Sequence, residues 1–318
     1  MGYFLAALVL VDGLVSRNPS AWASLPRALL ALYIVGVAVL DLYRAGQHLD
    51  VLAAVIVGIV AAMVVSESYR ALISGLSLWV IYLGAFVLAR SVRSDWAGDV
   101  TLAGVIVSVF ALVMYFIPPP EGAWNRNVIG AVLVVCLAAS FVSSNLTRSL
   151  IILSGILLTG SRGAMTGAFV AWAVMYYARA LVAAPALAGG LIMIRPVTAE
   201  ERIVCWAQGM RAWLDHFAFG VGPGLIENPV FWNGQWWMRH AHNAYIALGA
   251  QVGLVGLAVL AAFVAVSRRA NISRAAIAAL AGVATHSIVD DPLIALPVGL
   301  MLVLLVSQPG CDTPGESQ

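Results

Sequence analysis

Residues 100–117 read VTLAGVIVSVFALVMYFI, a stretch without a single charged side chain. An α-helix rises about 1.5 Å per residue and the hydrocarbon core of a bilayer is about 30 Å thick, so this stretch is typical of a helix that crosses a membrane. Of the 318 residues in the chain, 62% are hydrophobic and 10% are charged, and the mean hydropathy is +0.95. A soluble domain of this size cannot bury so much apolar surface, and the sequence therefore predicts an integral membrane protein.

Similar apolar runs lie on both sides of this stretch. They cover residues 2–16, 25–43, 51–66, 71–90, 128–144, 149–161, 163–178, 180–194, 243–266, 275–289 and 292–307. Together they predict about twelve transmembrane helices, although several runs are shorter than the usual ~20 residues, which leaves a re-entrant or fused pair open. Because open strands cannot satisfy their backbone groups in lipid, we expect an all-α fold class, a polytopic membrane bundle in which residues 1–318 form a single transmembrane domain.

The distribution of charge gives no indication of a nucleic-acid partner, because the net charge is only +2 and the charged residues lie between apolar runs. Arg268, Arg269 and Arg274 form the densest basic cluster in a short loop, which places that side in the cytoplasm by the positive-inside rule. The opposite side then carries Arg162 and the long polar segment at residues 195–242. We expect arginines on that side to have an anionic ligand.

The polar segment contains a predicted amphipathic helix. Between Glu201 and Phe217, apolar residues recur at helical spacing, and such a helix is expected to lie on the membrane surface. The predicted apolar face consists of Ile203, Trp206, Met210, Trp213, Leu214 and Phe217, opposite Glu201, Cys205, Gln208 and Asp215.

A cluster of polar residues precedes the apolar run at 243–266. Arg239, His240, His242 and Asn243 lie together at the predicted mouth of this helix. Two interpretations stay open from the residues alone: His242 is an interfacial histidine with Asn243 capping the helix, or the cluster is a functional site.

Neither a metal nor a cofactor is predicted. The Asp, Glu and Cys residues near His240 and His242 are few, and no His-Glu-x-x-His pattern occurs. His286 and Asp290 lie one helical turn apart and are interpreted either as a structural pair or as site residues.

Three short motifs occur in a characteristic order. Residues 160–164 read GSRGA, Arg202 precedes Trp206 by four positions with GVGPG following at 220–224, and residues 242–245 read HNAY with GLVG following at 253–256. In this order, over about residues 155 to 260, the chain resembles the O-antigen ligase and O-antigen polymerase superfamily of bacterial envelope glycosyltransferases.

The resemblance implies an inner-membrane enzyme of lipopolysaccharide biosynthesis, with a periplasmic loop over a lateral cavity and an undecaprenyl-diphosphate-linked glycan as donor. His242 would be the general base, and Arg162 and Arg202 would stabilise the diphosphate leaving group, in an inverting reaction without metal. The same resemblance implies contacts to phosphate or sugar from Arg211, Arg239, His240, Asn243 and Tyr245.

Two alternatives remain beside an O-antigen ligase. A polymerase would use the next lipid-linked repeat as acceptor instead of a lipid A core sugar, and the sequence does not separate the two. A transporter of a small solute or glycan is the alternative outside the enzymes, because polar residues within a membrane can mark a translocation path. The charges lie mostly at the ends of apolar runs, which favours a site at the membrane surface.

Overall fold

The computed structural model describes a large part of the second and final thirds of the chain. It covers residues 82, 85, 95–117, 125–143, 145–177, 196–221, 228–232, 234–239, 241–268, 272–290 and 296–307. The predicted spans at 2–16, 25–43, 51–66 and 180–194 lie outside these residues, and the span at 71–90 is represented by Tyr82 and Ala85, which are both helical.

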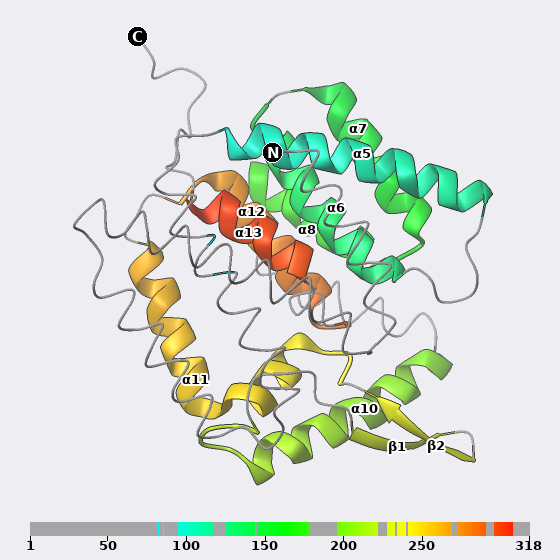
Figure 1. The fold of residues 1–318 in the computed structure, drawn as a ribbon, viewed down its shortest axis with the longest axis vertical. Coiled ribbons are helices and arrows are strands. Elements are labelled where there is room, and N and C mark those ends of the chain that lie inside the picture. Colours follow the sequence, from blue (N-terminus) through cyan, green and yellow to red (C-terminus); the bar gives the residue numbers. More distant parts are fainter. Residues whose placement is uncertain are drawn as a thin grey trace.

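Most of the described helices form one packed bundle (Figure 1). Its members are α5 (Trp96–Phe116), α6 (Arg126–Ser140), α7 (Leu146–Thr159), α8 (Arg162–Tyr176), α12 (Arg274–His286) and α13 (Leu296–Ser307). Helix α6 lies in the centre, where it contacts the five others and is buried at every position from 129 to 140. Each of these helices coincides with a predicted apolar run, so the helical architecture is confirmed for the described part of the chain.

One helix among the described residues is long enough to cross a membrane. Helix α5 has 21 residues and is apolar enough to cross a bilayer, whereas α6, α7, and the segments Ala244–Val255 and Val298–Ser307 are apolar but shorter. Large apolar side chains are exposed along α5, among them Val109, Leu112 and Phe116. The number of spans stays a prediction.

Helices α6, α7, α8 and α12 begin at polar capping residues. Asn125, Asn145, Ser161 and Ser273 each accept a hydrogen bond from a backbone N–H in the first turn of the helix that follows. Such caps satisfy donors that the helix itself leaves unpaired. Between α7 and α8 the chain turns within two residues, because Gly160 adopts the left-handed conformation with φ of 64° and Ser161 already caps α8.

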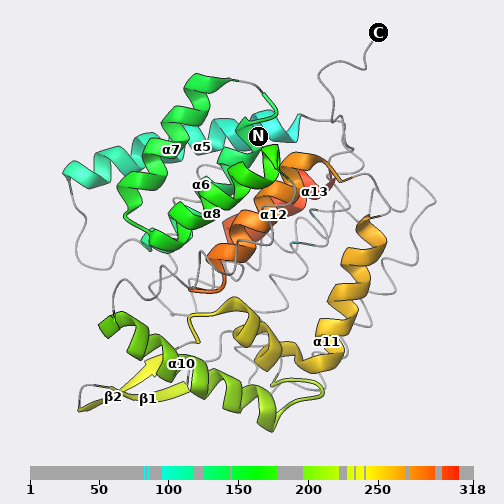
Figure 2. The ribbon, with the colours of Figure 1, turned by 180° about the vertical axis from the view of Figure 1, so that it is seen from behind.

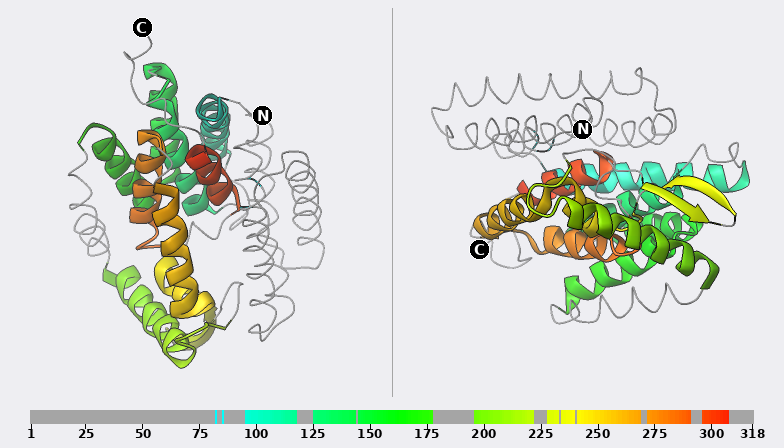
Figure 3. Two further views of the ribbon diagram at one scale, coloured as in Figure 1. Left: turned by 90° about the vertical axis from the view of Figure 1, so that its left-hand side faces the viewer. Right: turned by 90° about the horizontal axis from the view of Figure 1, so that it is seen from below.

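The polar segment and the helix after it form a second layer beside the bundle. Helix α10 (Pro196–Asp215) packs on α11 (Ala244–Arg268); in Figures 1 and 2 α10 lies below the bundle, and α11 rises from there at one side of it. Strands β1 (Asn228–Trp232) and β2 (Gln235–Arg239) form an antiparallel hairpin next to α10, also seen in Figure 3. The helix was predicted from the sequence, but the strands were not. Their signal in the sequence is Asn233-Gly234 between two aromatic runs, a dipeptide typical of hairpin turns.

The two faces of α10 differ from the predicted ones. Cys205, expected on the polar face, is 1% exposed, and Trp206 packs against an apolar cluster that includes Ala241 and Ile246. Ile203 and Leu214, expected on the same stripe as Trp206, are instead 56% and 61% exposed. The prediction was wrong because α10 has protein on one side, where the small, weakly polar thiol of Cys205 packs easily.

Helix α11 is interrupted at Gly253, where φ is 61° and ψ is −169°. The loop after α10 fills the interruption: the N–H groups of Leu254 and Val255 donate to the carbonyls of Phe217 and Ala218 at 2.9 and 3.0 Å. A Cβ atom at Gly253 would lie 2.5 Å from the backbone of Ala218, so a glycine is required here. The predicted uninterrupted run at 243–266 is therefore two helical pieces.

Candidate functional site

The start of α11 is held by the residues that follow α12. The Asn243 side chain donates to the carbonyl of Ile288 at 3.0 Å, and the N–H of Ala244 donates to the carbonyls of Ser287 and Asp290 at 2.9 and 3.1 Å. The other end of the Asn243 amide accepts from the N–H groups of the first turn of α11, as a helix cap does. The position of His242 is thus fixed by the end of α12.

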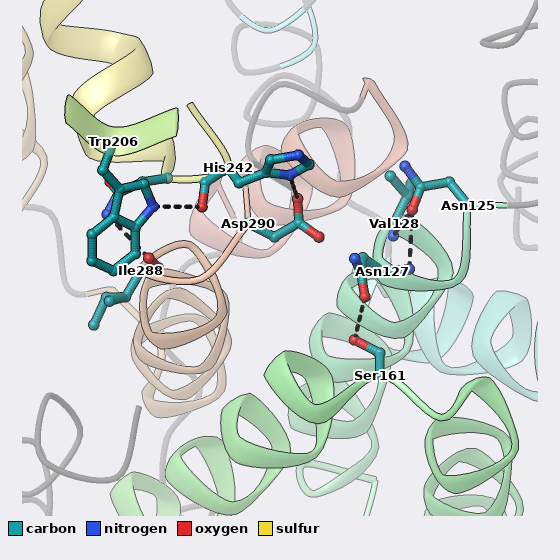
Figure 4. Close-up of polar contacts among 9 residues, drawn as sticks. Asn125, Asn127, Val128, Ser161, Trp206, His242, Ile288 and Asp290 are labelled. Atoms are coloured by element: carbon teal, nitrogen blue, oxygen red, sulfur yellow. Dashed lines mark hydrogen bonds and ion pairs between the residues drawn. The ribbon is translucent and has the colours of Figure 1, made fainter. Parts of the chain in front are cut away.

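His242 forms the polar centre of this region. Its Nδ1 lies 3.6 Å from Oδ1 of Asp290, and the side chains are 23% and 9% exposed. The two side chains point toward one another in Figure 4, where Trp206 of α10 also donates a hydrogen bond from Nε1 to the His242 carbonyl at 3.3 Å. His242 has a φ of 50°, which is uncommon for a residue other than glycine and costs about 1 kcal/mol. Backbone strain of this kind is concentrated at functional sites.

Arg162 approaches the same region from α8. It is the first residue of that helix, and its turn is anchored by the Ser161 hydroxyl, which donates to Oδ1 of Asn127 at 2.8 Å (Figure 4). The next residue, Gly163, lies directly against the ring of His286 at the end of α12. The beginning of α8 and the end of α12 are therefore in contact, with Arg162 beside that contact.

Arg202 is contributed by α10. It lies four residues before Trp206, one turn along the same face of the helix, and its guanidinium is within electrostatic range of His286, as is the Asp290 carboxylate. Arg162 and Arg202 are partly buried, and neither guanidinium has a hydrogen bond or ion pair with another described residue. A guanidinium at a helix N-terminus, as at Arg162, adds positive charge where the helix dipole is already positive.

The other predicted site residues have different surroundings. Arg211 is exposed and lies nine residues beyond Arg202, which is half a turn around α10 and about 13 Å along it. Tyr245 is exposed, and its hydroxyl donates to the carbonyl of Ala284 at 2.9 Å. Arg239 ends β2 opposite Asn228.

His240 lies outside the described residues. The start of α8 with Arg162, the side chain of Arg202, and the His242–Asn243 segment thus each adjoin the end of α12 or the turn after it, and Asn243 acts as a cap. Arg211 lies on the opposite side of α10 from Arg202.

The proximity of Asp290 to His242 was not predicted from the sequence. Asp290 was predicted to pair with His286, four residues earlier; its carboxylate does act electrostatically on His286, and it also lies 3.6 Å from His242, in the segment before α11. Two acidic residues, Asp290 and Asp291, follow α12, and no local pattern distinguishes them. Among the described residues no group of three His, Cys, Asp or Glu side chains could hold a metal ion.

Comparisons with protein-family models, with curated proteins and with solved structures found no match to this chain. A functional assignment has to rest on the residues themselves.

Proposed function

We propose that the protein is a membrane glycosyltransferase of the O-antigen ligase type, which moves a glycan from undecaprenyl diphosphate to a sugar hydroxyl of a lipid A core. The observation that supports this proposal best is the arrangement around the end of α12. A histidine paired with a carboxylate lies there beside two partly buried arginines that have no acidic partner among the described residues. Such an arrangement can bind an anion and accept a proton in the same place.

His242 is the proposed general base. The acceptor hydroxyl oxygen attacks the anomeric carbon of the donor and its proton passes to Nε2 of His242, while Nδ1 carries the proton that faces Asp290. The carboxylate holds the ring in this tautomer and stabilises the imidazolium that forms. The Nδ1–Oδ1 distance of 3.6 Å is longer than a hydrogen bond, and catalytic hydrogen bonds are often long before the substrate binds.

Arg162 and Arg202 are the proposed contacts of the leaving group. As the new glycosidic bond forms, the bond from the anomeric carbon to the diphosphate oxygen breaks, and the electron pair leaves on that oxygen. Two guanidinium groups stabilise this charge by hydrogen bonds, and the N-terminus of α8 adds to the positive potential. The single displacement inverts the anomeric centre, and the proposal contains no metal or cofactor step.

The chain would cross the inner membrane several times, with the segment at 195–242 and the site facing the periplasm. A polymerase, which joins lipid-linked repeats, needs the same base and the same arginines, so the acceptor is the one point that separates it from a ligase.

The break in α11 is the observation closest to a transporter, because discontinuous helices form the substrate sites of many transporters. In this chain the backbone groups at the break bind the loop after α10: Leu254 and Val255 donate to it, and the carbonyl of Ala250 accepts from Val221 at 2.9 Å. Groups satisfied in this way are not available to a solute, which favours the enzyme.

The test is transfer by purified protein from a lipid-diphosphate-linked glycan to separate acceptors, a lipid A core and a second lipid-linked repeat. We expect His242→Ala, Arg162→Ala and Arg202→Ala each to lower the rate about a hundredfold or more. Arg148→Ala is the matched control, because Arg148 is exposed near the start of α7, at the end of that helix away from Arg162.

Undiminished transfer by the His242 variant would remove it as the base. Absence of transfer to every acceptor, together with solute flux in liposomes, would favour the transporter instead.

A further inference from the structure

His286 is a buried histidine that the proposed reaction does not use. It is the last residue of α12 and is 1% exposed, and its Nδ1 has no hydrogen-bond partner in the described part of the chain. Leaving a buried polar atom without a partner costs about 1–3 kcal/mol, so an apolar side chain would fill this position at lower cost. The stability of the fold therefore does not explain why a histidine occupies this position.

His286 lies between the start of α8, which carries Arg162, and the turn that carries Asp290. On one side its ring lies against Gly163: a Cβ atom there would be 2.7 Å from Nε2 and still closer to Cδ2. On the other side the chain continues from His286 into the turn whose carbonyls hold Asn243 and Ala244 and whose Asp290 carboxylate faces His242. The charged groups that act on the ring are Asp290, from this turn, and Arg202, from α10.

We propose that His286 is a positioning residue, which by its contact with Gly163 sets the place of Arg162 relative to the Asp290–His242 pair. The inference rests on the proposed function, since it assigns Arg162 to the leaving group and His242 to the acceptor. Arg162 follows the turn at Gly160 and Ser161, and its backbone is adjacent to Gly163, so a displacement of Gly163 moves Arg162 as well. The ring is too deeply buried to take a proton from a substrate itself.

If His286 positions Arg162 through its contact with Gly163, kcat should depend on how closely the ring packs against that glycine. Gly163→Ala places a methyl group where the ring lies, which forces the start of α8 away from α12. His286→Ala leaves a gap into which the same turn can move. A shift of about 1 Å can cost a hundredfold in rate, and we expect each variant to lower kcat about tenfold or more. In the double variant the added methyl group occupies the space that the ring has left, and we expect kcat to be higher than in Gly163→Ala alone.

The matched control is Gly167→Ala, one turn further along α8. A Cβ atom at Gly167 would lie 2.6 Å from the carbonyl oxygen of Gly282 on α12, so this variant disturbs the same pair of helices at a point that does not touch His286. If His286 acts only in packing, Gly163→Ala and Gly167→Ala should lower Tm and kcat in proportion to each other. Positioning predicts a larger loss of kcat for Gly163→Ala at a comparable Tm.

The experiment measures kcat, KM for donor and acceptor, and Tm of the full chain for wild type, the three single variants and the double variant. A kcat for His286→Ala equal to that of wild type, or no recovery in the double variant, would overturn the inference. Should Gly163→Ala not fold, His286→Ala is compared with Gly167→Ala: positioning predicts a larger loss of kcat for His286→Ala at a comparable Tm, and losses in proportion to Tm would overturn the inference. Wild type without transfer activity would instead reject the proposed function, so the two failures are distinguishable.

Discussion

At the scale of single residues, sequence and structure contribute different parts of the site. The proposed site residues Arg162, Arg202 and His242 could be predicted from short motifs. Asp290 could not, because it lies 48 positions beyond His242 and the contact exists only through the packing of α11 against the end of α12. The positive φ of His242 was equally hidden from the sequence, which carries no glycine there.

Asp290→Asn tests the role of this carboxylate. The amide has the same shape but no charge, so it neither stabilises an imidazolium nor favours the tautomer with a proton on Nδ1. We expect kcat to fall about a hundredfold, with little change in KM for the donor, whose diphosphate is assigned to the arginines. The measurement is steady-state transfer beside Asp215→Asn, a control at an exposed carboxylate on α10. Equal rates for Asp290→Asn and this control would show that the carboxylate only supports the fold.

At the scale of elements, hydrophobic periodicity predicted where helices occur better than it predicted what each face contacts. The apolar runs located the bundle helices to within a few residues, because a helix buried in protein or lipid needs apolar side chains in either case. In α10 the apolar residues of this pattern lie in two different environments, one facing the protein and one facing outward. Trp206 faces the protein, whereas Ile203 and Leu214 face outward, and the sequence cannot state which partner covers an apolar side chain.

The outward apolar residues of α10 are predicted to contact lipid. Leu214→Cys should react slowly with a water-soluble maleimide when the protein is in lipid nanodiscs, because the membrane interface covers this face. Asp215→Cys, at the neighbouring position, should react faster and serves as the comparison. Reaction rates are measured by mass spectrometry, and the wild-type chain gives the background from its native cysteines. Equal rates at the two positions in nanodiscs would place this face of α10 in water.

At the scale of the whole molecule, the hydropathy of the chain predicted a helical bundle but not which helices are neighbours. Hydrogen bonds and contacts now bring several helix ends together: α6 and α8 begin at the same end of the bundle, where Asn127 meets Ser161, and α12 ends there against Gly163. Helix α11 begins at this end too, through Asn243 and Ile288. The candidate site thus lies at one end of the bundle, which fits the proposed reaction at a membrane surface.

The same arrangement predicts the orientation of the protein. Arg148 and Arg274 lie at the starts of α7 and α12, which are the ends of these helices away from the site, and basic residues are enriched on the cytoplasmic side of membrane proteins. The site should therefore face away from the cytoplasm. In right-side-out membrane vesicles, an impermeant maleimide should label Asp215→Cys directly.

Ser143→Cys, in the turn before α7, is the counterpart on the other side and should be labelled only after the vesicles are opened with detergent. Inverted vesicles should exchange the two results. Labelling of both positions from the same side would contradict the prediction that the site lies on one side of the bilayer and Arg148 and Arg274 on the other. In that case His242 would not lie at the membrane surface opposite Arg148 and Arg274, where the lipid-linked donor is proposed to bind. The proposed location of the reaction would then be rejected, even if the protein catalysed transfer in detergent.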